Sequence, residues 1–210
     1  STEPTEEPTE EPTAEPTATP TSAPTPSPTV APTATPVPTV PPEVAPPIIL
    51  PTVASCPLAA EDGAPLATIV YPGAWFTVAE PPELACRYFD PESITVPDDP
   101  ASLSTAIMVT TESTPYAEAV AAATDPAAWE VRQQVELVVD GLAATLVAAE
   151  AIDAPGVPAG VSRTAYLLDY GTAGTLTLAT TGEADSELYA PHAAILTLMV
   201  GLSTFTPPEG

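Results

Sequence analysis

The chain has 210 residues and a formal net charge of −25, because 28 acidic residues are opposed by only three arginines and no lysine. A surface with this charge repels nucleic acids and anionic membranes, so both are poor partners, and it suits solubility, a saline medium or a cationic partner. The length suffices for one domain of ordinary size and an additional segment.

Residues 1–47 differ in composition from the rest of the chain. They hold 15 of the 31 prolines, 12 threonines and 7 glutamates, with no aromatic or basic residue. Such a segment cannot bury enough apolar surface to offset the entropy of ordering it. We therefore predict a disordered Thr/Pro/Glu-rich stalk over 1–47, stiffened towards polyproline II, and a single folded domain over 48–210. The stalk fits an O-glycosylated spacer and an unmodified acidic one equally well.

The start of the sequence suggests an exported protein. No apolar stretch reaches the roughly 18 residues of a membrane span, and no signal peptide begins at Ser1. In bacterial lipoproteins a polar spacer of this kind comes directly after the lipidated cysteine. We therefore expect an extracellular or cell-surface protein, with a lipid anchor upstream of Ser1 as one form of attachment.

The two cysteines, Cys56 and Cys86, lack the spacing and the neighbouring histidine of a zinc site. In an exported protein two cysteines favour a disulfide. Closing this loop would stabilise the fold by roughly 3–4 kcal/mol. Two buried free thiols are the alternative.

Strands are expected in the first half of the domain at 66–71, 85–89 and 103–111, and the first of them is followed by a turn at Pro72-Gly73 and the run 75–78. Alternation places three apolar side chains of the last strand on one face: Leu103, Ile107 and Val109. Thr114 and Pro115 then predict the start of a short helix that runs to about Ala123, and Asp125 starts another turn.

A hairpin is the clearest element of the sequence. The β-rich runs 130–139 and 142–151 flank Asp140-Gly141, a dipeptide suited to a type I′ turn. One register satisfies both the turn and the apolar pattern, and it turns the paired apolar residues towards the core. It pairs Val139 with Leu142, Leu137 with Ala144, Val135 with Leu146 and Glu136 with Thr145.

A second hairpin is expected from 161–170 and 175–181. Its register stays open, because Tyr166, Leu168 and Tyr170 share a face with Leu176 and Leu178 only if the loop has an odd number of residues.

The last helix is expected over 188–201, followed by a short strand at Phe205. Its predicted apolar stripe comprises Leu188, Ile195, Leu198, Met199 and Leu202.

No catalytic, cofactor-binding or metal-binding residue is predicted. His192, the single histidine, lies on the apolar stripe of the last helix, which favours a packing role. The glycines of Gly171–Gly174 have no helix after them, unlike a phosphate loop. Asp98-Asp99 lacks calcium-loop spacing. Core packing is favoured over a carbohydrate-binding surface for the aromatic residues Tyr71, Trp75, Tyr88, Tyr116 and Trp129.

Short motifs in a fixed order give the chain a resemblance to a family. They are Tyr71-Pro-Gly-Ala-Trp75, Cys86-Arg-Tyr-Phe-Asp-Pro91, Val139-Asp-Gly141, Pro158-Ala-Gly160 and a final helix leading to Ser203-Thr-Phe205. Their order over residues 54–206 resembles secreted actinobacterial and related proteins with a PsbP/Mog1-like domain. The resemblance implies an α+β fold, an α/β/α sandwich around an antiparallel sheet, and a Cys56–Cys86 bridge.

The resemblance transfers no catalytic activity, because this superfamily mostly supplies binding and assembly domains. The function expected is a non-catalytic interaction or assembly domain, displayed from the cell surface by its stalk and bound to a protein or envelope component. A lipoprotein that binds a small or apolar ligand is the alternative, and a hydrolase is third.

Overall fold

The computed structural model describes residues 52–60 and 63–207. The chain divides into two units, Ser1–Pro47 and Ile48–Gly210. The predicted disorder of residues 1–47 lies outside the described part of the chain.

The described part is an α+β domain of antiparallel strands with two α-helices, as the sequence predicts. The helices are α1 (Tyr116–Ala123) and α2 (Tyr189–Leu202). The strands are β1 (Val53–Ala59), β2 (Pro65–Pro72), β3 (Phe76–Thr77), β4 (Tyr88–Asp90), β5 (Ile107–Glu112), β6 (Trp129–Val139), β7 (Leu142–Ala151), β8 (Val161–Asp169), β9 (Thr175–Glu183) and β10 (Thr204–Phe205). Three short 3₁₀ turns complete the set: η1 (Pro82–Leu84), η2 (Pro100–Ser102) and η3 (Gly171–Ala173).

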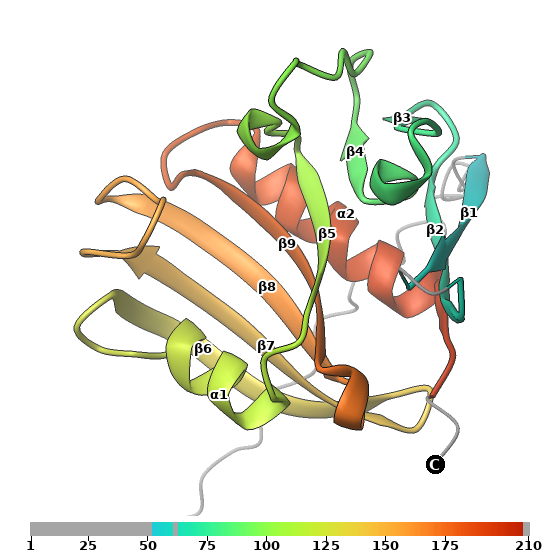
Figure 1. Cartoon of the computed structure of the whole chain (residues 1–210). Helices are drawn as coiled ribbons and strands as arrows, with labels where there is room; N and C mark the ends of the chain where they lie inside the picture. Colours follow the sequence, from blue (N-terminus) through green and yellow to red (C-terminus); the bar gives the residue numbers. More distant parts are fainter. Residues whose placement is uncertain (1–51, 61–62, 208–210) are drawn as a thin grey trace, which may run out of the picture. The chain divides into compact units, whose positions relative to one another are not determined.

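Two sheets form the domain (Figure 1). The larger has seven strands in the order β3-β4-β5-β9-β8-β7-β6, so β3 and β6 are its edges. The smaller has the order β1-β2-β10 and joins both ends of the described chain. Every pairing is antiparallel.

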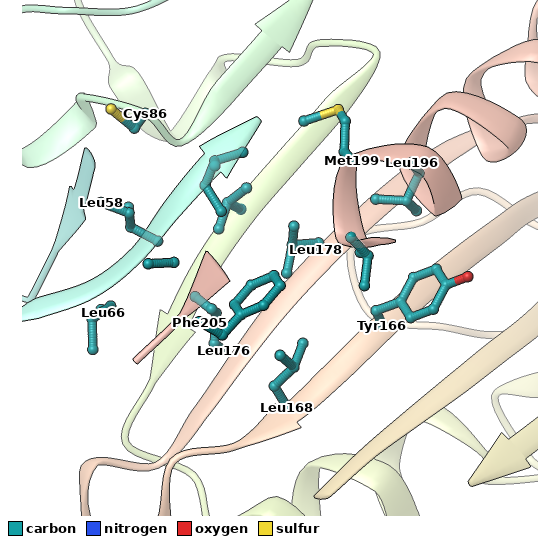
Figure 2. Close-up of a cluster of buried hydrophobic side chains, with 14 of the residues drawn as sticks. Leu58, Leu66, Cys86, Tyr166, Leu168, Leu176, Leu178, Leu196, Met199 and Phe205 are labelled. Carbon is teal, nitrogen blue, oxygen red and sulfur yellow. The ribbon is translucent and has the colours of Figure 1, made fainter. Parts of the chain in front are cut away.

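One face of the large sheet packs against α2 and the small sheet, and we call it the α2 face. Large apolar side chains of β8 and β9 point from it towards α2 and β10, as Figure 2 shows for Leu168 and Leu178, which lie beside Phe205 of β10. All three are almost completely buried. This cluster is the main hydrophobic core.

The opposite face, which we call the α1 face, carries a second and smaller cluster. Its buried residues are mostly small, with Trp129 and Leu167 as the large exceptions: Ala123, Trp129, Val147, Ala149, Ala151, Ala154, Ala165 and Leu167. Because helices cover both faces of the sheet, the layers are those of the expected α/β/α sandwich, with the small sheet added beside α2.

Both hairpins have the pairing that the sequence allows. The four predicted β6–β7 pairs are all present, from Val139 with Leu142 to Val135 with Leu146. Asp140 and Gly141 both have positive φ, 50° and 85°, as a type I′ turn requires. In the second hairpin Asp169 pairs with Thr175, so the loop has an odd number of residues and the large side chains share the α2 face.

Three local details differ from the sequence predictions. Leu103 lies outside β5 and packs with Val78 and Leu84 in a separate small cluster. The strand expected over 85–89 begins only at Tyr88, because Cys86 has a φ of 61°, which a strand cannot contain. The helix at 116–123 starts after Pro115, and no side chain caps it.

The apolar stripe predicted for the last helix is wrong in three of its five members. Leu188, Leu198 and Leu202 are 63%, 59% and 57% exposed. The buried positions of α2 are instead Leu196, Met199 and Val200. The helix is apolar on all sides, so its periodicity does not mark the face that meets the sheet.

Candidate functional site

The disulfide between Cys56 and Cys86 is present and ties β1 to the turn before β4. The two Cα atoms are 5.7 Å apart, within the usual range. No free cysteine occurs among the described residues. The bridge is structural, because Cys86 is buried against the main core.

His192 lies half-buried on the first turns of α2. Its ring packs edge-on against Trp75, with 5.6 Å between the ring centroids. This contact is the packing role that the sequence favours for the histidine.

The other candidate groups are separated in space. Within residues 52–60 and 63–207, no three His, Cys, Asp or Glu side chains lie close enough to hold a metal ion. Asp98 and Asp99 lie before η2, and the glycines at 171 and 174 flank the 3₁₀ turn of the β8–β9 loop. The aromatic side chains are divided among three clusters and form no shared surface: Tyr71 and Trp75, then Tyr116 and Trp129, then Tyr88.

An open cleft of about 740 Å³ lies between β2, the end of β5 and the β8–β9 loop. Leu66, Tyr170 and Leu176 form its apolar wall. The Tyr170 hydroxyl donates to the Leu66 carbonyl oxygen at 2.7 Å. Burial, and secondarily the charge of Asp140, raise the pKa of this phenol above its usual value. Tyr170 is therefore a neutral structural donor at ordinary pH.

The free edge of β6 is the most exposed apolar part of the large sheet. The strand pairs with β7 on one side only, and Val131, Val135 and Val138 are exposed along it, Val138 by 73%. The sequence predicts that Val135 faces the core. It has the predicted partner, but it lies at the sheet edge where no element of the described chain covers it.

Two grooves flank this edge at its Val138 end. The groove on the α1 face has a volume of about 620 Å³ and is lined by α1, β6 and β7. The groove on the α2 face, about 390 Å³, lies between β6, Tyr166 and the last turns of α2. Leu137 and Val138 belong to both walls, so the strand forms a ridge between two hollows.

The charges around the edge are mostly negative. Arg132 is the only cation on β6, and it bonds to Glu130 at 3.0 Å and to Glu150 at 3.1 Å. Glu136 adds a further carboxylate to the groove on the α1 face, and Asp140 lines the groove on the α2 face.

The three arginines have different partners in the structure. Arg87 donates to the Thr111 hydroxyl and to the Ala59 carbonyl oxygen, and Arg132 is in the ion pairs just described. Arg163 has neither a hydrogen bond nor an ion pair within 52–60 and 63–207, and it lies 5.6 Å over the Trp129 ring. Burial lowers its pKa from the ordinary value, and the charge of Glu112 opposes the shift.

Comparison of the chain with protein-family models, with curated proteins and with solved structures found no match. The resemblance to PsbP/Mog1-like domains therefore stays a prediction from short motifs. No helix in the described part of the chain is long and apolar enough to cross a membrane.

Proposed function

We propose that this protein is a non-catalytic interaction domain of the cell exterior, carried by the stalk of residues 1–47, and that the free edge of β6 is its binding surface. The partner is a protein with an extended segment that bears lysine or arginine. The observation that carries the proposal is the long uncovered edge strand between two grooves.

The backbone of β6 supports strand addition. An edge strand presents unpaired N–H and C=O groups, and an extended peptide that pairs with them gains main-chain hydrogen bonds. A strand this exposed is a liability unless something covers or protects it. The bulge between Val131 and Gln133 protects part of the edge, whereas the half from Gln134 to Val139 pairs regularly with β7 and is open on its other side.

The grooves support specificity. Side chains of an added strand point alternately to the two faces of the sheet. On this edge one set would enter the groove beside α1 and the other the groove beside α2. Apolar side chains in these grooves would cover the parts of Leu137 and Val138 that are now exposed.

The charge supports a cationic partner. The chain carries −25 overall, and the single arginine of β6 is already neutralised by two glutamates. Opposite charge accelerates association and disfavours acidic competitors, more strongly at low salt.

A soluble peptide tests this surface directly. A short synthetic peptide of alternating lysine and valine is titrated into the full chain while the backbone amide shifts are followed by NMR. We expect the shifts to concentrate on β6, with β3, the other edge of the sheet, unaffected. A peptide of alternating glutamate and valine is the charge control. Equal binding of both peptides, or shifts away from β6, would contradict the proposal.

A matched pair of variants tests whether the peptide binds at β6. Val138→Lys adds a positive charge at the proposed surface. It should lower the affinity for the lysine-valine peptide by about tenfold or more. Val53→Lys makes the same change at an exposed position of β1 and should have no effect. If both variants bind alike, the partner lies elsewhere.

The role of the stalk has its own test. Removal of residues 1–47 should leave the peptide affinity unchanged, because the surface lies on the domain. It should reduce engagement of a partner at the cell surface, since a tether raises the effective concentration there. Equal engagement without the stalk would contradict the tether but leave the β6 surface intact.

A small-ligand function is the second candidate, supported by the open cleft beside Tyr170. Its volume of about 740 Å³ is in the range of small-molecule sites. Ala173→Trp, at the exposed rim of this cleft, should abolish ligand binding there and leave peptide binding at β6 unchanged.

A further inference from the structure

The α1 face contains a second small cavity, of about 250 Å³, that the proposed β6 surface does not use. It lies between α1 and the sheet. Its polar lining comes from Glu112, Thr114, Arg163 and Thr177, and its apolar lining from Ala119, Ala122, Ala123, Trp129, Pro155 and Leu167. A site of this size holds a molecule of only a few heavy atoms.

Arg163 is in an unusual position for a cation. It stands on β8 between the buried Ser162 and Thr164, on the face that also carries Ala165 and Leu167. Its only close partner among the described residues is the face of Trp129, which is 6% exposed. A guanidinium has five N–H donors and no acceptor. The Arg163 side chain makes no hydrogen bond within residues 52–60 and 63–207, and no carboxylate there lies within ion-pair distance of it.

Two hydroxyls of the cavity are also without hydrogen-bond partners among residues 52–60 and 63–207. Thr177 is 5% exposed, and neither its hydroxyl nor that of Thr114 bonds to the described residues. The neighbouring Thr175 differs, because its hydroxyl donates to the Thr114 carbonyl oxygen at 2.9 Å. The cavity is therefore lined by two neutral hydroxyl donors and by the guanidinium of Arg163.

We propose that this cavity binds the carboxylate of a small monocarboxylic acid, with Arg163 as the bidentate donor and Thr114 and Thr177 as further donors. A planar guanidinium matches a carboxylate through two parallel hydrogen bonds. Trp129 supports the guanidinium from its face and keeps it in place.

Glu112 determines which acids are accepted. Its charge acts on Arg163, yet the two side chains form no ion pair. It therefore repels dianions such as phosphate, while an ammonium group on the ligand could pair with it. Amino acids should consequently bind better than simple carboxylates of equal size, and inorganic phosphate should bind worst.

Fluorescence of Trp129 is the probe. In the full chain carrying Trp75→Phe, Trp129 is the single tryptophan, and titration with propionate, alanine or inorganic phosphate should change its emission. We expect saturable changes with alanine and propionate, alanine the tighter, and weak or no change with phosphate. Phosphate binding as tight as that of the carboxylates would overturn the assignment, as would the absence of any saturable change.

Three variants separate binding from packing. Arg163→Met should lower the affinity for propionate by about tenfold or more. Arg163→Lys keeps the charge but not the planar guanidinium, and it should also lower this affinity. Arg132→Met removes an exposed arginine and should change nothing. Because Arg163 is desolvated and makes no ion pair among the described residues, Arg163→Met should melt at the same temperature as the parent or higher. A large loss of thermal stability in this variant, with ligand binding retained in Arg163→Lys, would show that Arg163 is a packing residue only.

Discussion

The two faces of the large sheet are built from alternate residues of the same strands, yet they differ in what they bury. On the α2 face, β8 contributes Tyr166 and Leu168, which pack with α2 and Phe205 in a continuous core. On the α1 face, the neighbouring positions contribute Ala165, Leu167 and Arg163 beneath a helix of only two turns.

This difference separates the face that supplies most of the stability from the face that holds the cavity proposed to bind a carboxylate. The α2 face has mostly large side chains at its centre, so it supplies most of the hydrophobic stabilisation. The α1 face has mostly alanines, which leave space for a cavity and a buried charge that a tightly packed face would exclude. Functional sites are expected where packing is incomplete. On the α1 face, both the groove beside β6 and the cavity beside Arg163 are of this kind.

Truncation of two adjacent leucines tests the comparison most strongly. Leu168→Ala, on the α2 face, should lower the free energy of unfolding by about 3–5 kcal/mol. Leu167→Ala, on the α1 face, should lower it by about 2–3 kcal/mol, because Leu167 borders a cavity and belongs to the smaller cluster. Urea unfolding of both variants gives the ranking, and the reverse order would contradict the assignment of the main core.

The disulfide should have the next largest effect. The double variant Cys56→Ser/Cys86→Ser should lose about 3 kcal/mol, since the bridge closes a loop across 30 positions of sequence. Thermal melts with and without a reductant provide the measurement. An unchanged melt would mean that the small sheet holds β1 without the bridge.

Strand β6 allows the same comparison at the sheet edge. Leu137 is half-buried against the main core, and Leu137→Asp should cost about 2 kcal/mol by placing a charge there. Glu136, its neighbour on the α1 face, is exposed, and Glu136→Lys should change stability by less than about 0.5 kcal/mol. If the two variants melted in the opposite order, the faces of β6 would be exchanged.

The smallest expected effects on stability come from the removal of two tyrosine hydroxyls. Tyr170→Phe loses the bond to the Leu66 carbonyl, and Tyr116→Phe loses a 2.6 Å bond to the Thr145 hydroxyl. Each should cost about 1 kcal/mol. The contribution of Tyr170 should depend on pH, because its folded-state pKa is raised. Its stabilisation is complete below about pH 10 and falls as the pH rises further. Chemical denaturation across this range should show a shallower alkaline decline in Tyr170→Phe than in the parent.

The local pairing of the strands is predictable because turn chemistry and apolar pattern agree there. Asp140-Gly141 fixes the register of β6 with β7, and the register of the second hairpin is determined once the loop length is known. The sequence places the start of the helix at 116–123 within two residues. The predicted Thr114 cap is wrong, because Pro115 occupies the N-cap position and no side chain bonds to the first turn.

Long-range features are not predictable from these patterns. The pairing of β10 with β2 joins residues far apart in the sequence, and no turn signal connects them. The predicted orientation of α2 is wrong because a helix that is apolar all round carries no facial signal. Composition marks Arg163 only as one of three rare cations. Strand alternation, which places it on the same face as Ala165 and Leu167, is a signal that the sequence does carry. An arginine at an inward position of a strand needs an explanation from its surroundings.

The position of the Cys56–Cys86 bridge has a mechanical consequence. A force applied to the chain before Val53 can peel only the first residues of β1, because at Cys56 the tension passes through the covalent bond to Cys86. The loop between the two cysteines, which includes β2 and β3, is then shielded from the load. Reduction of the bridge would release these 30 positions, a hidden length of about 100 Å when fully extended. Under tension the oxidised domain would thus extend by about 100 Å less than the reduced one.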